Sequence, residues 1–294
     1  MLILTGQTAS GKSTLAVDLA LEFRAEIVNA DSRQVYRGMT IGTAAPAAEQ
    51  LAAVPHHLVG FLEPDERYSA ARFVEDARLA IDEIHRRGKR AIVAGGTGFY
   101  VRALTGAVQL AEQYDPQLRE RLATEARIHG AAFLHEWLRV LDPKRAAMLH
   151  AADSYRVVRA LEVALARRRQ GLPPLHLRPL QAQGISTLKV LLTIDPAELD
   201  RRIEERTDDM LERGLIEEAE CIGAKAVAAS AVGYPQALAY LHGWSTYAEM
   251  RLLLIRATRR YAKRQASWFA NEPDTIAAPP SAVAQLAREM LGWV

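Results

Sequence analysis

The sequence predicts an α/β fold in which a parallel sheet, flanked by helices, carries an inserted all-helical segment. Short apolar runs typical of buried strands occur at Met1–Leu4, Glu26–Asn29 and Arg90–Ala94. Between them, apolar residues recur at helical spacing in Ser13–Phe23 and Ser69–Arg87. Strands that alternate with helices in this way form a parallel sheet that helices cover on both faces.

The middle of the chain has a different pattern. Between residues 114 and 166 helical spacing replaces the strand pattern, until three prolines between Gly171 and Leu180 interrupt it. A further strand, Leu188–Ile194, then returns to the sheet. We therefore expect an α/β core of residues 1–113 and 181–294 and a helical insertion domain of residues 114–180. The helices expected in the insertion are Pro116–His129, Ala131–Val140, Pro143–His150 and Ser154–Arg169.

Composition excludes several classes of protein. Of the 294 residues, 49% are hydrophobic and 24% are charged, which is ordinary for a globular protein and excludes disordered and coiled-coil chains. No apolar run approaches the roughly 20 residues of a membrane helix, so we expect a cytoplasmic protein with no membrane role. Cys221 is the only cysteine, which excludes a structural disulfide and a thiolate zinc site.

Basic residues are concentrated in two segments, although the formal net charge is only +2. Residues 251–270 contain six Lys or Arg residues and no carboxylate, and residues 151–180 contain six arginines against Asp153 and Glu162. Separate basic patches on a nearly neutral protein favour a polyanion that docks at particular places. Solvated helix faces are the alternative explanation of the same pattern.

Residues Gly6–Ser13, with the sequence GQTASGKS, match the Walker A pattern between an expected strand and an expected helix. There the glycines let the backbone wrap around phosphate, and successive N–H groups at a helix start bind anions. Lys12 offers a point charge to a diphosphate, and the Ser13 hydroxyl is a ligand for Mg²⁺. The residues expected to bind phosphate are Gly6, Gln7, Thr8, Ala9, Ser10, Gly11, Lys12 and Ser13.

Polar residues also follow the second and third expected strands. Ligands of such sheets bind at the carboxyl ends of the strands, which places Asp31 near the phosphate loop. A carboxylate there can act as a general base or hold Mg²⁺ through water, although a turn former is the alternative role of Asp31. The third strand leads into the glycine-rich run Gly95–Tyr100, where Thr97 offers a hydroxyl to substrate or phosphate.

Together these motifs resemble the successive signatures of the tRNA dimethylallyltransferase family, in the family's order and over nearly the whole chain. The departures are Gln7 for the usual proline, Ala45 for lysine, Ala151-Ala152 for Pro-Asn and Ala270 for arginine. The resemblance rests on Gly6–Ser13, Asp31–Tyr36, Gly42-Thr43-Ala44, Gly95–Tyr100 with Arg102-Ala103-Leu104, Asp142-Pro143, Arg156–Val163, Met210–Glu218, Val232-Gly233-Tyr234 and Lys263–Trp268.

The resemblance implies a P-loop kinase-like core that transfers a dimethylallyl group from dimethylallyl diphosphate, with Mg²⁺ as cofactor. The acceptor would be N6 of the adenosine just 3′ of the anticodon in tRNA, and the helical insertion would clasp the anticodon stem-loop. The residues implied to contact tRNA are Asp31, Ser32, Arg33, Gln34, Thr97, Arg119, Tyr155, Arg156, Arg159, Gly233, Tyr234, Arg260, Lys263, Arg264 and Gln265.

The residue types suit this chemistry. N6 of adenine is a poor nucleophile, so a carboxylate that accepts an N6 proton lowers the barrier, and we expect Asp31 to be that base. Lys12, Mg²⁺, the loop amides and Arg206 would stabilise the leaving diphosphate, while Thr97 would donate a hydrogen bond near the scissile oxygen. An ion pair with Glu205 or Asp209 on its own helix is the alternative role of Arg206.

Two other functions fit parts of the sequence. A small-molecule P-loop kinase would use ATP and an arginine-rich lid within residues 114–180, and a non-catalytic RNA-binding module would keep only a relict phosphate loop. The intact Gly11-Lys12-Ser13 and Asp31 argue against the second. We expect a monomer, because no apolar surface stripe is left unexplained.

Overall fold

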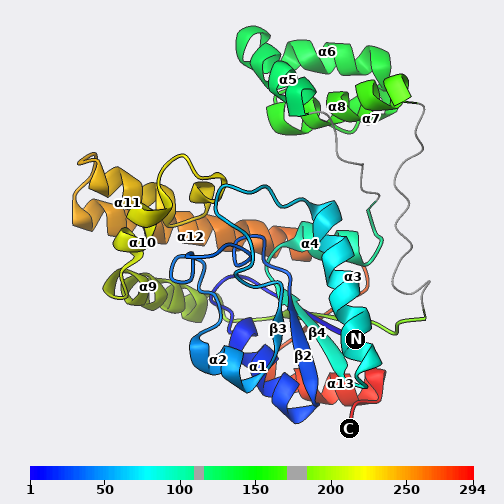
Figure 1. The fold of residues 1–294 in the computed structure, drawn as a ribbon, viewed down its shortest axis with the longest axis vertical. Helices are drawn as coiled ribbons and strands as arrows, with labels where there is room; N and C mark the ends of the chain where they lie inside the picture. Colours follow the sequence, from blue (N-terminus) through cyan, green and yellow to red (C-terminus); the bar gives the residue numbers. More distant parts are fainter. Residues whose placement is uncertain (109–115, 171–183) are drawn as a thin grey trace. The chain divides into compact units, whose positions relative to one another are not determined.

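The computed structural model describes residues 1–108, 116–170 and 184–294, which fall into two compact units (Figure 1). One unit comprises Met1–Val108 and Arg178–Val294, and the other comprises Gln109–Leu177. The expected domain ends at residues 113–114 and 180–181, and the expected break at Gly171–Leu180, lie outside the described residues. No helix among the described residues combines the length and apolar content needed to span a bilayer.

The first unit is built on a sheet whose described strands are all parallel and follow the order β3-β2-β4-β1-β5-β6. The four strands expected from the sequence are all present. β3 and β6 were not foreseen, because each forms by pairing with a strand that is distant along the chain. The strands are β1 (Leu2–Thr5), β2 (Ala25–Asn29), β3 (His56–His57), β4 (Arg90–Gly95), β5 (Leu188–Leu192) and β6 (Thr275–Ala278).

Helices surround this sheet, and several begin where the sequence supplies a cap. The Ser69 side chain accepts a hydrogen bond from the Arg72 amide, and Asp195 caps the helix that follows it in the same way. The helices of this unit are α1 (Lys12–Glu22), α2 (Ala48–Ala53), α3 (Ala70–Arg86), α4 (Gly98–Leu104), α9 (Pro196–Glu212), α10 (Leu215–Ile222), α11 (Tyr234–Leu241), α12 (Tyr247–Phe269) and α13 (Val283–Leu291), with 3₁₀ turns at Val227–Ser230 and Pro280–Ala282.

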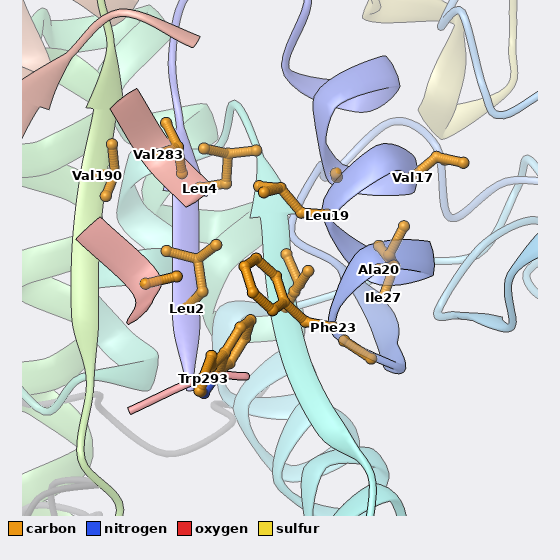
Figure 2. Close-up of a cluster of buried hydrophobic side chains, with 14 of the residues drawn as sticks. Leu2, Leu4, Val17, Leu19, Ala20, Phe23, Ile27, Val190, Val283 and Trp293 are labelled. Carbon is orange, nitrogen blue, oxygen red and sulfur yellow. The ribbon is translucent and has the colours of Figure 1, made fainter. Parts of the chain in front are cut away.

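One face of the sheet packs against α1 and α13. Figure 2 shows Leu2 and Leu4 of β1 in contact with this layer, to which the end of α1 contributes Phe23 and α13 contributes Val283. Phe23 also meets the Trp293 ring edge-on, with centroids 5.4 Å apart. Helix α3 contacts β2 and β4 but contributes nothing to this cluster, as expected for a helix on the opposite face.

The second unit is helical throughout its described residues. Its helices are α5 (Pro116–His129), α6 (Ala131–Leu141), α7 (Pro143–Ala146) and α8 (Ser154–Gln170). The expected helix Pro143–His150 is wrong at its end, because the chain tightens into turns after Ala146, where Met148 N–H bonds to the Arg145 carbonyl. His135 Nε2 lies 3.0 Å from the Ala146 carbonyl, which also accepts from the Leu149 amide. The core of the unit consists of Leu122, Leu134, Leu138, Ala146, Val157, Ala160 and Leu161.

The register of the sheet brings three strand ends together. Thr5 at the end of β1 is paired with Gly95 at the end of β4, and Asn29 of β2 is paired with Ala94. Gly95 lies so close to the backbone that follows β2 that a Cβ on Gly95 would be 2.2 Å from the carbonyl of Ala30. The loops after β1, β2 and β4 therefore start side by side at one edge of the sheet.

Gly95→Ala should lower the free energy of unfolding by about 3 kcal/mol or more, because its methyl group meets backbone that cannot move aside. Gly292→Ala is the matched control, since Gly292 has a left-handed conformation but a Cβ added there would meet nothing within 4 Å. That change should cost about 1 kcal/mol. Urea denaturation measures both, and a Gly95→Ala protein as stable as Gly292→Ala would contradict the close approach of β4 to Ala30.

Candidate active site

The phosphate loop between β1 and α1 is preformed for an anion. Ala9 and Gly11 both have positive φ angles, 62° and 86°, which turn the chain sharply before the helix. Among the described residues, none accepts a hydrogen bond from the amides of Gly11, Lys12 or Ser13. These unpaired N–H groups at a helix start form the anion-binding end that the motif predicts. The Thr8 and Ser10 amides are instead bonded within the protein, to Gln265 and to Gln7.

Lys12, Arg206 and Asp31 form one electrostatic cluster beside this loop. Lys12 Nζ donates to the Gln7 carbonyl at 3.1 Å. Burial lowers the pKa of Lys12 to about 8, an effect that Asp31 opposes and Arg206 reinforces. Burial likewise lowers the pKa of the Arg206 guanidinium, again against the attraction of Asp31. Two desolvated cations thus share one carboxylate, an imbalance that a bound diphosphate would neutralise.

Arg206 forms no ion pair with a carboxylate of its own helix among the described residues. Glu205 forms an ion pair with Arg201, and Asp209 pairs with Arg213 at 3.2 Å. Both candidate helix partners therefore bind other arginines, and the attraction of Asp31 for the Arg206 guanidinium is larger than that of Asp209. One turn earlier on the same helix, Arg202 Nη1 lies 3.4 Å from a Cβ built on Gly11. Arg202 was not foreseen from the sequence, although its spacing of four from Arg206 puts both on one helix face.

Asp31 is held by the turn that follows β2. Its Oδ1 accepts from the Arg33 amide at 2.9 Å, and its own amide donates to Asn29 Oδ1 at 3.1 Å. The turn-forming role is thus real. Among the described residues, Oδ2 has no hydrogen-bond partner and is 3.8 Å from a Cβ built on Gly96. One oxygen of Asp31 fixes the loop while the other is open to a proton donor.

Thr97 connects the loops after β2 and β4. Its Oγ1 accepts from the Ser32 amide at 2.9 Å and lies 3.3 Å from Ser32 Oγ, and the Thr97 amide donates to the Ala30 carbonyl. Asp31, Ser32 and Thr97, which the sequence singled out from separate motifs, are therefore neighbours. This juxtaposition follows from the adjacent, parallel ends of β2 and β4.

Helix α12 contacts the phosphate loop and the loop after β4 through one of its faces. Gln265 is buried, accepts from Thr8 N at 2.7 Å and donates to the Gly96 carbonyl at 2.9 Å. Its expected contact with tRNA needs correction, because both ends of its amide are used inside the protein. Trp268 packs on Gly98, where a Cβ would lie 2.1 Å from the indole ring. Gln7, the departure from the usual proline, donates to the Ala262 carbonyl of the same helix at 3.2 Å.

The loop around Gly42 is fixed by buried polar contacts. Gln34 Nε2 donates to the carbonyls of Thr43 and Ala44, so this end of its amide is not offered to a base. Glu218 accepts from the Gly42 amide at 2.8 Å and from the Tyr234 hydroxyl at 2.7 Å. Tyr234 is fully buried and the preceding Gly233 is buried too. Their expected contact with tRNA is corrected to a structural role, because no side-chain surface is left for it.

Tyr261 of α12 is a further site residue. Its helical spacing from Leu254 and Ala257 predicts only a stripe that packs on the core. It is half-buried, and burial together with the negative charge of Asp31 raises its pKa. The positive charges of Arg33, Arg264 and Arg206 oppose that effect, and the Arg264 guanidinium carbon lies over the Tyr261 ring, 5.6 Å from its centroid. The helical spacing that predicted a buried stripe could not show that the stripe passes beside the active site.

The arginines of the helical unit serve its own core first. Glu162 is buried and accepts from Arg119 at 3.0 Å and from Arg159 at 2.7 Å, so both arginines balance an internal charge. Their contact with tRNA, which the resemblance implied, stays a prediction. Arg156 pairs with Asp153 at 3.2 Å while remaining largely exposed, and Tyr155 is 81% exposed.

Some of the basic residues of α12 also form ion pairs. Arg259 pairs with Asp200 and Glu204, and Arg251 pairs with Asp208, because the acidic α9 lies alongside. Of the five basic residues that helical spacing places on one face of α12, Arg259 is the one with an ion-pair partner among the described residues; the five are Arg256, Arg259, Arg260, Lys263 and Arg264. Arg256, Arg260 and Lys263 are exposed and have no ion-pair partner in the part of the chain that the structure describes.

A parallel α/β sheet with a phosphate loop after its first strand, and a carboxylate and a hydroxyl at neighbouring strand ends, defines a P-loop kinase-like protein. Comparison with known proteins narrows the class. The family model described as IPP transferase matches residues 34–272. The tRNA dimethylallyltransferase of Geobacter sulfurreducens is 42% identical over 93% of this chain and 89% of its own length. The enzyme of that name from Anaeromyxobacter dehalogenans is 44% identical over 99% and 98%.

Solved structures agree with this grouping. The tRNA isopentenylpyrophosphate transferase of Bacillus halodurans superposes with a TM-score of 0.71 at 34% identity, covering 99% of this chain and 95% of that one. A eukaryotic dimethylallyltransferase acting on tRNA gives a TM-score of 0.77 at 25% identity, covering 98% and 75%. The chain belongs to the tRNA dimethylallyltransferase family.

The low pKa of Lys12 gives a pH prediction. The unliganded lysine should lose its proton as pH rises through about 8, so the affinity for an alkyl diphosphate should fall above that pH, by at most tenfold per unit. Lys12→Arg should bind with nearly constant affinity over the same range, since arginine stays protonated. Calorimetric titration at several pH values measures this, with a ligand whose own charge is constant there. Parallel profiles for the two proteins would contradict the assignment.

Proposed function

We propose that this protein transfers the dimethylallyl group of dimethylallyl diphosphate to N6 of the adenosine just 3′ of the anticodon in tRNA, releasing diphosphate. The observation that carries the proposal is the meeting of an anion-binding loop and the open Oδ2 of Asp31 at one edge of the sheet. Family membership supports it and favours prenyl transfer over a small-molecule kinase. The proposal includes a monomeric enzyme that works in the cytoplasm.

The acceptor half of the reaction belongs to Asp31. As the N6–C bond forms, the amine nitrogen becomes positively charged and must lose a proton. Asp31 Oδ2 takes that proton, while the bond from Arg33 N–H to Oδ1 keeps the carboxylate in place. A positioned general base typically contributes 10²–10⁴-fold to the rate.

The leaving-group half belongs to the phosphate loop. As the allylic C–O bond breaks, negative charge develops on the diphosphate, and the amides of Gly11 to Ser13, the Lys12 ammonium and the Arg206 guanidinium stabilise it. Arg202 stands near the same loop. Because Lys12 and Arg206 are already desolvated, they need no reorganisation when the charge appears.

Mg²⁺ is part of the proposal, with Ser13 as its protein ligand. No group of three or more His, Cys, Asp or Glu side chains capable of holding a metal occurs among the described residues. Mg²⁺ commonly takes most of its ligands from substrate phosphates and water. The exposed Ser13 hydroxyl would add one ligand from the protein. When bound, the ion would neutralise charge on the leaving diphosphate.

The direct test offers the purified protein bulk tRNA with dimethylallyl diphosphate in one assay, and ATP with small metabolites and bulk tRNA in another. Prenylated adenosine after nuclease digestion, together with diphosphate release, is the expected result. ATP turnover on a small metabolite with no change in the tRNA would overturn the proposal, and binding of tRNA with neither product would point to a non-catalytic module.

Two variants separate the roles of Asp31. Asp31→Asn keeps an Oδ1 that accepts from the Arg33 amide but removes the base, whereas Asp31→Ala removes both. Both should lower turnover by at least about 10²-fold and leave tRNA affinity within several-fold. Single-turnover rates and filter binding measure the two quantities. Near-normal turnover in Asp31→Asn would leave Asp31 with a turn-forming role only.

The exposed charges of α12 should position tRNA without taking part in the reaction. Arg260→Ala and Lys263→Ala should each weaken tRNA binding and flatten its salt dependence by about one counterion or less, while saturating tRNA restores most of the rate. Arg259→Ala is the matched control, because Arg259 is neutralised by Asp200 and Glu204. If all three variants gave the same slope of log affinity against log salt, this face of α12 would not lie on the tRNA path.

A further inference from the structure

The inward face of α12 makes a continuous set of contacts with the two loops of the active site. Its residues Ala262, Gln265 and Trp268 follow each other at intervals of three and therefore share one side of the helix. Ala262 accepts from Gln7 of the phosphate loop, Gln265 bonds to both loops, and Trp268 packs on Gly98 after β4. Gln265 is the one of the three whose side chain joins the loops by hydrogen bonds.

The primary amide of Gln265 meets both hydrogen-bonding demands made on this side chain. The Thr8 amide is a donor that needs an acceptor, and the Gly96 carbonyl is an acceptor that needs a donor. Glutamine offers both at the ends of one short planar group. Because Gln265 is only 5% exposed, water has little access to replace a lost bond, and either backbone group would be left unsatisfied.

The fit around the amide is tight as well as polar. A Cβ built on Gly96 would lie 2.3 Å from Gln265 Nε2, so the absence of a side chain at Gly96 allows the close approach. Gly96 immediately precedes Thr97, whose hydroxyl accepts from Ser32 next to Asp31. Thr8 lies within the loop that ends at Lys12. Gln265 is thus bonded on one side to the loop that holds Lys12 and on the other to the loop that holds Thr97.

We propose that Gln265 is a positioning residue that sets the spacing between the phosphate loop and the Gly96–Thr97 loop. It thereby aligns the phosphate loop, which acts on the leaving diphosphate, with Thr97 and, through the contact between Thr97 and Ser32, with Asp31, which acts on the attacking amine. The role rests on the proposed function and replaces the direct tRNA contact that the resemblance implied for this residue. In-line displacement makes the rate sensitive to this spacing, because small displacements of reacting groups cost large factors in rate.

Two variants test the proposal. Gln265→Glu keeps the acceptor for Thr8 but loses the donor to Gly96 when ionised, and regains an O–H donor when protonated. Its turnover at saturating substrates should be lower than that of the parent by about tenfold or more at pH 8. The ratio of variant to parent turnover should rise as pH falls toward about 5.5, because burial raises the pKa of the introduced carboxyl. Gln265→Met, which has neither group, should be slow with a ratio that does not vary with pH.

The measurements are turnover and KM for tRNA, with each variant's folding checked by thermal unfolding. We expect the loss in turnover, and a KM for tRNA close to the parent value, because the amide is buried. Parent-like turnover in Gln265→Met, or a raised KM with full turnover at saturating tRNA, would overturn the proposal. If Gln265→Glu does not fold, Gln265→Met alone tests the proposal, by whether turnover falls while the KM for tRNA stays close to the parent value. A parent protein that forms no prenylated adenosine would instead refute the proposed function.

Discussion

The pairing of β4 with both β1 and β2 is the constraint on which the active site depends. Because all three strands are parallel, their carboxyl ends emerge at one edge, and the contact of Gly95 with the Ala30 backbone leaves no room for a side chain between them. The phosphate loop, Asp31 and Thr97 are consequently neighbours although they are distant in sequence. Gln265 of helix α12 then bonds to the phosphate loop and to the loop that carries Thr97. A change in strand pairing would therefore separate the phosphate loop, Asp31 and Thr97.

The site keeps its positive charge at a cost in stability. Lys12 and Arg206 are desolvated, which lowers the pKa of each, and Asp31 offsets only part of that effect. Since the folded-state pKa of Lys12 is about 8 against an ordinary 10.5, its contribution favours unfolding at neutral pH, and this penalty is relieved as pH rises between those two values. A diphosphate would reverse the balance by restoring a counter-charge, which is the expected behaviour of a site built for an anionic ligand.

Basic residues in this protein divide into two groups that composition cannot distinguish. Arg119 and Arg159 surround the buried Glu162, and Arg259 is held by two carboxylates of α9, so these arginines stabilise structure. Arg260 and Lys263 on the same α12 are exposed and face solvent. Long-range attraction to a polyanion depends on the basic residues without an ion-pair partner, because the charge of the paired arginines is offset by their carboxylates.

The sequence by itself determined the alternation of strands and helices, the phosphate loop at Gly6–Ser13 and the candidate roles of Asp31 and Thr97, because each depends on local spacing. Only the tertiary structure decided which charges were paired and which polar side chains were buried. Tyr234 and Gln265 carry the residue types of an RNA contact, yet packing against Glu218, Thr8 and Gly96 buries them. The edge strands β3 and β6, Arg202 and Tyr261 also depended on contacts distant in sequence. Local pattern specifies which groups a chain carries, and packing between remote segments decides which of them meet.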